Sequence, residues 1–186
     1  IIFILIFFFD KEMPPLRKLL ILINPFSGRR LALRQWDIAK PILLKCHVEM
    51  TEIRTERAGH AYELANDLKK GEYDGIVTVS GDGLIHEIVN AIFRRDDWFQ
   101  LLSTLTLGFI PAGTSNGLVK NISEQAGEEF GVETSAYLVG KGRSMRMDLT
   151  EIECEYQKEK VYSVLSVAWA IIADCDLNSE VFRCLG

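Results

Sequence analysis

The residues best suited to chemistry in this sequence form a Gly-Asp-Gly turn, Gly81 to Gly83, which lies between an apolar strand pattern and a helical pattern. The two glycines lack a Cβ atom, so the backbone can approach a ligand closely, and the free amides at a helix start favour anions. The carboxylate of Asp82 would repel a phosphate. Its presence makes sense if it accepts a proton from an attacking hydroxyl or helps to organise Mg²⁺. The alternative is a tight strand-to-helix turn in which Asp82 is an ordinary cap.

The elements that must position this turn alternate between strand and helix from Leu16 onward, which predicts a three-layer α/β domain with a mostly parallel sheet. A continuous apolar run predicts a strand at 19–23, alternation predicts one at 48–53, and further strands are expected at 75–79 and 105–110. Helical spacing predicts helices from Arg30, over 59–69 and over 84–93. Small polar residues follow the strands, and ligands of open α/β sheets bind at such strand ends. We therefore expect the turns to share one ligand-binding rim.

The second half of the chain reads differently. Residues 127–142 are polar and glycine-spaced, which predicts an irregular crossing. Two strand-like runs, 145–155 and 161–169, are joined by the charged stretch 157–160, which we expect to be a turn, and this pattern predicts a β-hairpin. We expect the hairpin to open a second, β-rich domain near Met145.

Composition and chain ends restrict the class of protein. The formal net charge of −5 argues against nucleic acid as a partner. The 4 cysteines lack metal-ligand spacing, so we expect reduced thiols in an intracellular protein. The apolar run at 1–9 is too short to span a bilayer and lacks the features of a signal peptide. We expect residues 1–12 to be either upstream sequence or the end of a truncated segment, 1–15 to lie outside the domain, and the chain to be a fragment.

A series of ordered blocks resembles the sphingosine kinases, within the wider diacylglycerol-kinase-like lipid kinases. The blocks are Asn24-Pro25-x-x-Gly28, Thr55-Glu56-Arg57-Ala58-Gly59-His60-Ala61, Ser80-Gly81-Asp82-Gly83-Leu84-Ile85-His86-Glu87-Ile88-Val89-Asn90, Pro111-Ala112-Gly113-Thr114-Ser115-Asn116 and Ser163-Val164-Leu165-Ser166-Val167-Ala168-Trp169. The stretch from Ala173 to Gly186 is the part that is similar to the sphingosine branch in particular. The resemblance covers nearly everything from Leu16 to Gly186.

The resemblance implies an ATP-binding α/β domain over 16–144, followed by a β-sandwich-like lipid-binding domain of which 145–186 would be the incomplete start. It implies ATP and Mg²⁺ as cofactors and Asp82 as the catalytic base for a lipid hydroxyl. The residues that would contact ATP are Asn24, Pro25, Phe26, Thr55, Glu56, Arg57, Ala58, Gly59, Ser80, Gly81, Gly83, Glu87, Gly113, Thr114, Ser115 and Arg183. Ser115 stands where the family often has glycine, so a positive φ at this position would strain the loop.

The same resemblance assigns Asp176, Asp174 and Ser166 to the substrate. Sphingosine carries an ammonium beside its primary hydroxyl, so a carboxylate there would pair the charge and orient the nucleophile, whereas diacylglycerol would need none. The expected activity is an ATP-dependent sphingoid-base kinase that meets its lipid at a membrane surface, in a cytoplasmic, peripherally membrane-associated protein. The alternatives are a kinase for a neutral lipid, diacylglycerol or ceramide, and a catalytically inert nucleotide-binding fragment.

Overall fold

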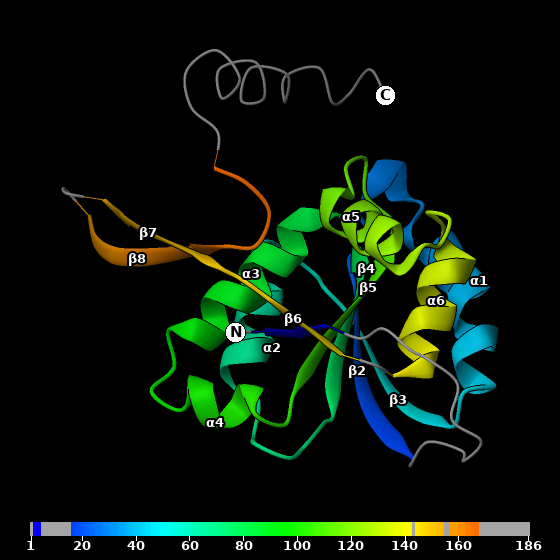
Figure 1. Ribbon diagram of the computed structural model, residues 1–186, viewed down its shortest axis with the longest axis horizontal. Helices are drawn as coiled ribbons and strands as arrows, with labels where there is room; N and C mark the ends of the chain where they lie inside the picture. Colours follow the sequence, from blue (N-terminus) through cyan, green and yellow to red (C-terminus); the bar gives the residue numbers. More distant parts are fainter. Residues whose placement is uncertain (1, 5–15, 143, 155–156, 168–186) are drawn as a thin grey trace.

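The protein folds around a twisted sheet of mostly parallel strands. The computed structural model describes residues 2–4, 16–142, 144–154 and 157–167. The sheet has the strand order β3-β2-β4-β5-β1-β6, and β3, β2, β4 and β5 are all parallel (Figure 1). These strands are β2 (Arg17–Ile23), β3 (Val48–Arg54), β4 (Gly75–Ser80) and β5 (Thr106–Pro111). The predicted α/β class with a mostly parallel sheet is confirmed.

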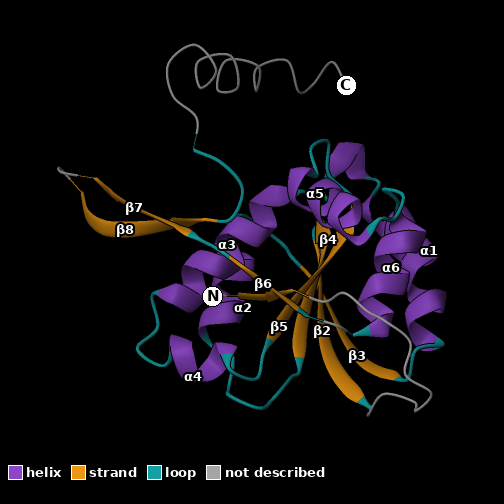
Figure 2. Cartoon of the chain, in the orientation of Figure 1, coloured by secondary structure: helices purple, strands orange, loops and turns teal. Residues whose placement is uncertain are grey.

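Helices cover both faces of this sheet, because successive strand side chains point to opposite sides. Leu20 and Leu22 of β2 pack into one apolar cluster, while Leu19, Ile21 and Ile23 pack into the other. Figure 2 shows α1 and α6 on one side of the sheet and α2, α3 and α4 on the other. The helices are α1 (Ala32–Leu44), α2 (His60–Asn66), α3 (Asp82–Phe93), α4 (Trp98–Leu102), α5 (Gly117–Ala126) and α6 (Val132–Lys141), and a short 3-10 turn, η1 (Gly28–Arg30), precedes α1.

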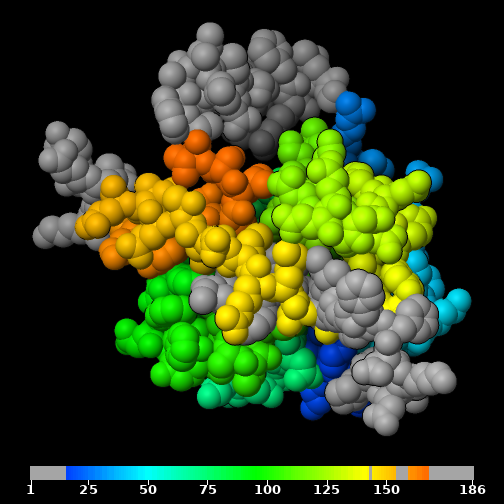
Figure 3. Space-filling view, in the orientation of Figure 1, coloured from blue at the N-terminus to red at the C-terminus, as the bar shows by residue number. Residues whose placement is uncertain are grey.

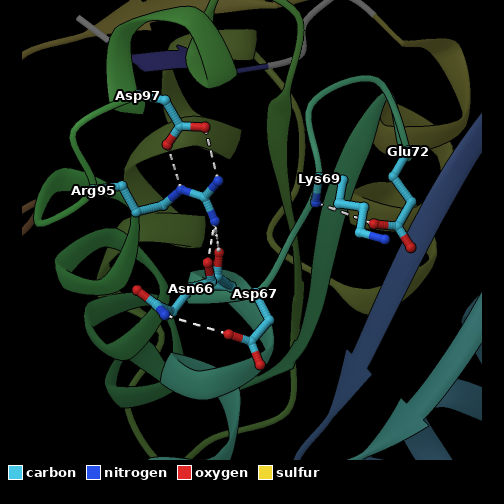
Figure 4. Close-up of polar contacts among 7 residues, drawn as sticks. Asn66, Asp67, Lys69, Glu72, Arg95 and Asp97 are labelled. Atoms are coloured by element: carbon cyan, nitrogen blue, oxygen red, sulfur yellow. Dashed lines mark hydrogen bonds and ion pairs between the residues drawn. The ribbon is translucent and has the colours of Figure 1, made fainter.

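Arg95, which follows α3, ties that helix to the end of α2 (Figure 4). Its guanidinium forms a two-pronged ion pair with Asp97, at 2.7 and 2.9 Å, and also donates to the carbonyl oxygens of Ala65 and Asn66. Those carbonyls lie at the C-terminus of a helix and lack intrahelical partners, so a cation there satisfies them. The hydrogen bond from Arg95 lowers the pKa of the Asp97 carboxyl. The packing of α2 beside α3 is thereby fixed at one end.

The predicted irregular crossing at 127–142 is wrong, because α6 occupies Val132–Lys141. Gly140 makes this part look non-helical in the sequence, but it lies inside α6, where an added Cβ would overlap the Cys46 sulfur that follows α1. The glycine therefore allows the two helices to approach each other closely. At the start of the same stretch, Gly127 has a left-handed φ of 71° and ends helix α5.

The hairpin is present, but its strands and turn differ from the prediction. It consists of β7 (Thr150–Cys154) and β8 (Gln157–Ser163), so the charged stretch 157–160 lies in a strand and not in a turn. Two of those charges have partners, since Lys160 pairs with Glu151 at 2.7 Å and Glu159 pairs with Arg94 at 2.9 Å. A β-sandwich beyond this hairpin stays a prediction.

The segment before the hairpin joins the main sheet. β6 (Met145–Met147) pairs antiparallel with β1 (Ile2–Ile4), which itself lies beside β5. The division into 1–15, 16–144 and 145–186 stays a prediction. Within the described ranges, each helix is too short or too polar to cross a bilayer.

Candidate active site

The turns that follow β2, β3, β4 and β5 meet along one edge of the sheet, because neighbouring parallel strands end on the same side. Backbone hydrogen bonds connect each turn to its neighbour. The amide of Asn24 donates to Val79 at 3.1 Å, the amide of Thr55 donates to Ile23 at 2.8 Å, and the amide of Ala112 donates to Ser80 at 2.9 Å. The turns that were expected to share a rim do lie along one rim.

The rim is closed by glycine backbones in direct contact. A Cβ on Gly113 would lie 2.8 Å from the nitrogen of Gly81 and 2.9 Å from the oxygen of Ser115. Gly28 has a φ of 50°, and a Cβ there would overlap the carbonyl of Ala112. Atoms of the main chain cannot swing aside as a flexible side chain can. These turns therefore require glycine for packing, whether or not a ligand is present.

The turn after β2 is held by its own polar side chains. The carbonyl oxygen of the Asn24 side chain accepts from the amide of Phe26 at 3.0 Å, which is an Asx turn. The hydroxyl of Ser27 accepts from the amide of Gly81 at 3.2 Å, which connects this turn to the turn after β4. The side chain of Phe26 is 62% exposed at the rim. Sequence reasoning assigned no role to Ser27, although it lies inside the first matched block.

The turn after β3 places a charged pair beside the rim. Thr55 is buried, and the Arg57 guanidinium donates to both oxygens of Glu63 at 2.8 and 2.7 Å. These hydrogen bonds raise the pKa of Arg57 above its ordinary value. Gly59 takes a left-handed φ of 78° where α2 begins. The amide of Glu56 donates to Nδ1 of His60 at 3.1 Å, so His60 holds the turn that precedes α2.

Asp82 lies in the first turn of α3 but does not cap that helix. Its Oδ2 accepts from the amide of Gly117 at 2.9 Å, and its Oδ1 accepts from the amide of Leu118 at 3.4 Å. These amides open α5, so the carboxylate neutralises the positive end of a different helix. Neither the prediction of a base nor the ordinary-cap alternative anticipated this partner.

The start of α3 itself is left open. Its N-cap residue is Gly81, and no side chain of the described residues caps it. A Cβ built on Gly83 meets nothing within 4 Å, so open space lies beside this first turn. Amides at a helix start have no intrahelical acceptor. The arrangement therefore combines free donors, space and a nearby carboxylate that is turned toward another helix.

The turn after β5 is closed by Asn116. Its side chain donates to the carbonyl of Gly113 at 2.8 Å and accepts from the amide of Gly113 at 3.2 Å. Ser115 does not need a positive φ, since the positive-φ non-glycine residues of the described ranges are Arg29, Arg30 and His47. The expected strain at Ser115 is absent. On its other flank the rim borders a hollow of about 190 Å³ that Gly113 and Asn116 also line.

Two further predicted residues lie near this edge. Glu87, on α3, has a buried oxygen, Oε2, without a hydrogen-bond partner. Ser166 is exposed after β8, and its carbonyl accepts from the hydroxyl of Ser163 at 3.1 Å. Its neighbour Leu165 lies against Gly117, since its methyl carbons are 3.2 and 3.3 Å from the place of a Gly117 Cβ. The chain after the hairpin thus returns to the helix start that Asp82 caps.

The remaining predicted residues, Arg183, Asp174 and Asp176, lie outside the described residues. Across the part of the chain that the structure describes, no group of three or more His, Cys, Asp or Glu side chains could hold a metal ion. The assignments of the site residues to ATP and lipid stay predictions.

Comparisons with known proteins give a consistent result. The family model described as the diacylglycerol kinase catalytic domain matches residues 18–152. The chain is 34% identical over 171 residues to Sphingosine kinase 1 of Arabidopsis thaliana, which covers 91% of this chain and 35% of the relative. It is 37% identical over 182 residues to human Sphingosine kinase 2, with 93% and 27% covered, and 34% identical over 175 residues to human Sphingosine kinase 1, with 91% and 45% covered.

Solved structures show the same fold. A putative diacylglycerol kinase from Bacillus anthracis superposes with a TM-score of 0.57 at 21% identity, over 73% of this chain and 41% of that chain. The chain spans less than half the length of these relatives.

Proposed function

This chain belongs to the diacylglycerol kinase catalytic domain family, and we propose that it is the ATP-binding part of a kinase that phosphorylates the primary hydroxyl of a sphingoid base to the 1-phosphate. The curated relatives that match it carry the names sphingosine kinase and sphingoid long chain base kinase. The supporting observation in the site is the uncapped start of α3, with Asp82 beside it.

Phosphoryl transfer asks a protein mainly to position the reactants and to neutralise charge. The open amides at the start of α3 suit a phosphate, because a helix N-terminus attracts anions. The bonds from Gly117 and Leu118 hold the Asp82 carboxylate to one side of that space. Asp82 can then accept the proton of a lipid hydroxyl without occupying the place of the phosphate. The carboxylate would thereby be kept away from the phosphate that it would otherwise repel.

The proposed ATP contacts follow the rim. They come from the turns 24–26, 55–59, 80–83 and 113–115 together with Glu87, and Arg183 would be added from beyond the described residues. Mg²⁺ binds proteins through one or two carboxylates and shares its remaining positions with phosphates and water. Glu87, with its unpartnered buried oxygen, would supply such a carboxylate. The ion would supply neutralisation of the phosphate charge.

The lipid side of the proposal lies in the second part of the chain. Residues 145–186 would begin a lipid-binding domain, with Ser166, Asp174 and Asp176 near the polar head of the substrate. The carboxylate of Asp176 would pair with the sphingoid ammonium. A sphingoid base is embedded in a membrane, so the enzyme would be cytoplasmic and would work at a membrane surface.

A second candidate is a kinase for a neutral lipid. It is favoured by the name of the matching family and by the solved structures, which are named diacylglycerol kinases. The direct test is to incubate the intact protein with labelled ATP and, in parallel, sphingosine, ceramide and diacylglycerol. Preferential labelling of sphingosine is expected. Preferential labelling of diacylglycerol would replace the proposal with the second candidate.

Asp82→Asn tests the base. An asparagine can still accept from Gly117, so the fold and ATP binding should persist, while turnover should fall by about 10²- to 10⁴-fold. The measurement is kcat together with the Kd of ATP. Asp37→Asn, on the exposed side of α1, is the matched control. Near-normal kcat in Asp82→Asn would remove Asp82 from the chemistry.

Asp176→Asn tests the class of lipid. A charge-assisted hydrogen bond contributes roughly 1.5–3 kcal/mol, so the KM for sphingosine should rise strongly while the KM for ATP stays nearly constant. The same change should matter little for an uncharged lipid. Unchanged sphingosine kinetics would leave no role for this carboxylate in recognition.

A further inference from the structure

The far end of α3 is attached to β8 through a side-chain amide. Asn90 is a buried polar residue, 6% exposed. Its side-chain nitrogen donates to the carbonyl of Tyr162 at 2.9 Å, and its side-chain oxygen accepts from the amide of Tyr162 at 2.9 Å. The same nitrogen also donates to the carbonyl of His86 within α3 at 2.9 Å. The side-chain amide of Asn90 therefore pairs with the backbone of β8 in the way that a neighbouring strand would.

Two more contacts join the same helix and strand. The ring of Phe93 lies against the ring of Tyr162, with 4.8 Å between centroids, and Arg94 pairs with Glu159 at 2.9 Å. Figure 3 shows the hairpin residues, in orange, lying over the green surface of this part of the chain. Of these contacts, the Asn90 pair alone engages both backbone groups of one residue, because its side chain supplies a donor and an acceptor and Tyr162 uses both.

The strand that Asn90 holds leads back to Asp82. β8 ends at Ser163, and Leu165 then lies against Gly117. The Oδ2 atom of Asp82 is 3.7 Å from the place of a Gly117 Cβ, while the methyl carbons of Leu165 are 3.2 and 3.3 Å from it. One helix thus carries the carboxylate at its start and, through Asn90, holds the strand whose continuation passes that carboxylate.

We propose that Asn90 is a positioning residue for the kinase reaction: by holding β8 on α3, it sets where segment 164–167 passes Asp82 and so aligns the lipid hydroxyl with the carboxylate. This inference rests on the proposed function. It assigns Asn90 no contact with ATP or with lipid. The contribution is to geometry, and a displacement of about 1 Å in a catalytic arrangement can lower a rate by about 10²-fold.

The test uses the intact protein and the variant Asn90→Asp. Aspartate keeps the size of the side chain and the acceptor for the Tyr162 amide, but it has no donor for the Tyr162 carbonyl. We expect kcat with sphingosine to fall by about 10- to 100-fold, while the Kd of ATP stays within about twofold. The matched control is Tyr162→Phe, which keeps the backbone groups and the ring and loses only the hydroxyl that donates to Glu151 at 3.1 Å. Its kcat should stay near that of the wild type.

Hydrogen–deuterium exchange in the wild-type protein tests the Asn90 contact even if a variant fails to fold. The Tyr162 amide should exchange with deuterium about as slowly as the amides in the middle of α3, and in Asn90→Ser it should exchange faster, because a serine hydroxyl is too short to span both groups. Rapid exchange in the wild type would overturn the inference. So would an unchanged kcat in Asn90→Asp, or a parallel loss of ATP binding, which would indicate a purely structural role. Absence of lipid phosphorylation by the wild type would instead refute the proposed function.

Discussion

The two ends of α3 are attached to the molecule in different ways. At the start, Gly81 lies against Gly113, and main-chain atoms meet main-chain atoms. Toward the end, Asn90, Phe93 and Arg94 reach β8 through their side chains. The first attachment has no room for an added atom, whereas the second can adjust one side chain at a time. The Gly81–Gly113 contact should therefore respond to substitution abruptly, and the contacts at the far end gradually.

Gly113→Ala should produce the largest loss. The new Cβ would come within 2.8 Å of the Gly81 nitrogen and 2.9 Å of the Ser115 oxygen, and neither atom can rotate away. We expect the free energy of unfolding to fall by about 2–4 kcal/mol, together with loss of ATP binding. Urea denaturation and nucleotide titration measure the two effects. A loss below about 0.5 kcal/mol would contradict the rigid character of this end.

Phe93→Leu should have an intermediate effect at the other end. The ring of Phe93 stacks on Trp98, with 4.9 Å between centroids, and packs on Tyr162. Leucine keeps most of the apolar volume and loses the aromatic contacts, so we expect about 1–2 kcal/mol of destabilisation with unchanged ATP affinity. Reduced ATP affinity would show that the two ends are not independent.

Gly83→Ala should separate packing from ligand binding at the start of α3. Nothing lies within 4 Å of a Cβ at this position and its φ is not positive, so alanine should stabilise the helix by about 0.5–1 kcal/mol. The methyl group would nevertheless enter the space proposed for a phosphate, so ATP affinity should decrease. A variant that binds ATP normally would move the phosphate away from Gly83.

The smallest effect should come from acidification of the hairpin. The hydrogen bond from Lys160, followed by that from Tyr162, lowers the pKa of the Glu151 carboxyl. Because the folded-state pKa lies below the unfolded value, this pair stabilises the hairpin above the ordinary glutamate pKa, and the contribution disappears as the pH falls through the depressed pKa. Carboxyl titration by NMR should show a higher Glu151 pKa in Lys160→Gln. An unchanged pKa would mean that the pair does not form in solution.

The sheet could be predicted from the sequence because its strands are local patterns. The run 19–23 is continuously apolar, as a strand buried on both faces must be, and 75–79 is interrupted only by Thr78; the two runs coincide with β2 and β4. The helix α6 could not be found in this way, since Gly140 disrupts the helical signal for a reason that is distant in the sequence: Cys46, just after α1, takes the space of its side chain.

Parts of the candidate site could likewise be predicted from local patterns, and other parts could not. The rim of turns followed from the rule that parallel strands end on one side, so the positions of Asn24, Thr55, Gly81 and Gly113 could be anticipated. The partner of Asp82 could not, because α5 was not predicted. The partner of Asn90 lies 72 residues further along the chain, and no short-range pattern encodes such a pair.

That separation of 72 residues also affects how the protein is made. A ribosome adds residues at about 5–20 per second, so Asn90 is synthesised roughly 4 to 14 s before Tyr162. Synthesis of the strands β2 to β5 and of the helices between them is completed within that interval. We therefore expect β8 to dock onto a helix that has already folded, and until then the amide of Asn90 remains hydrated and exposed to chaperones.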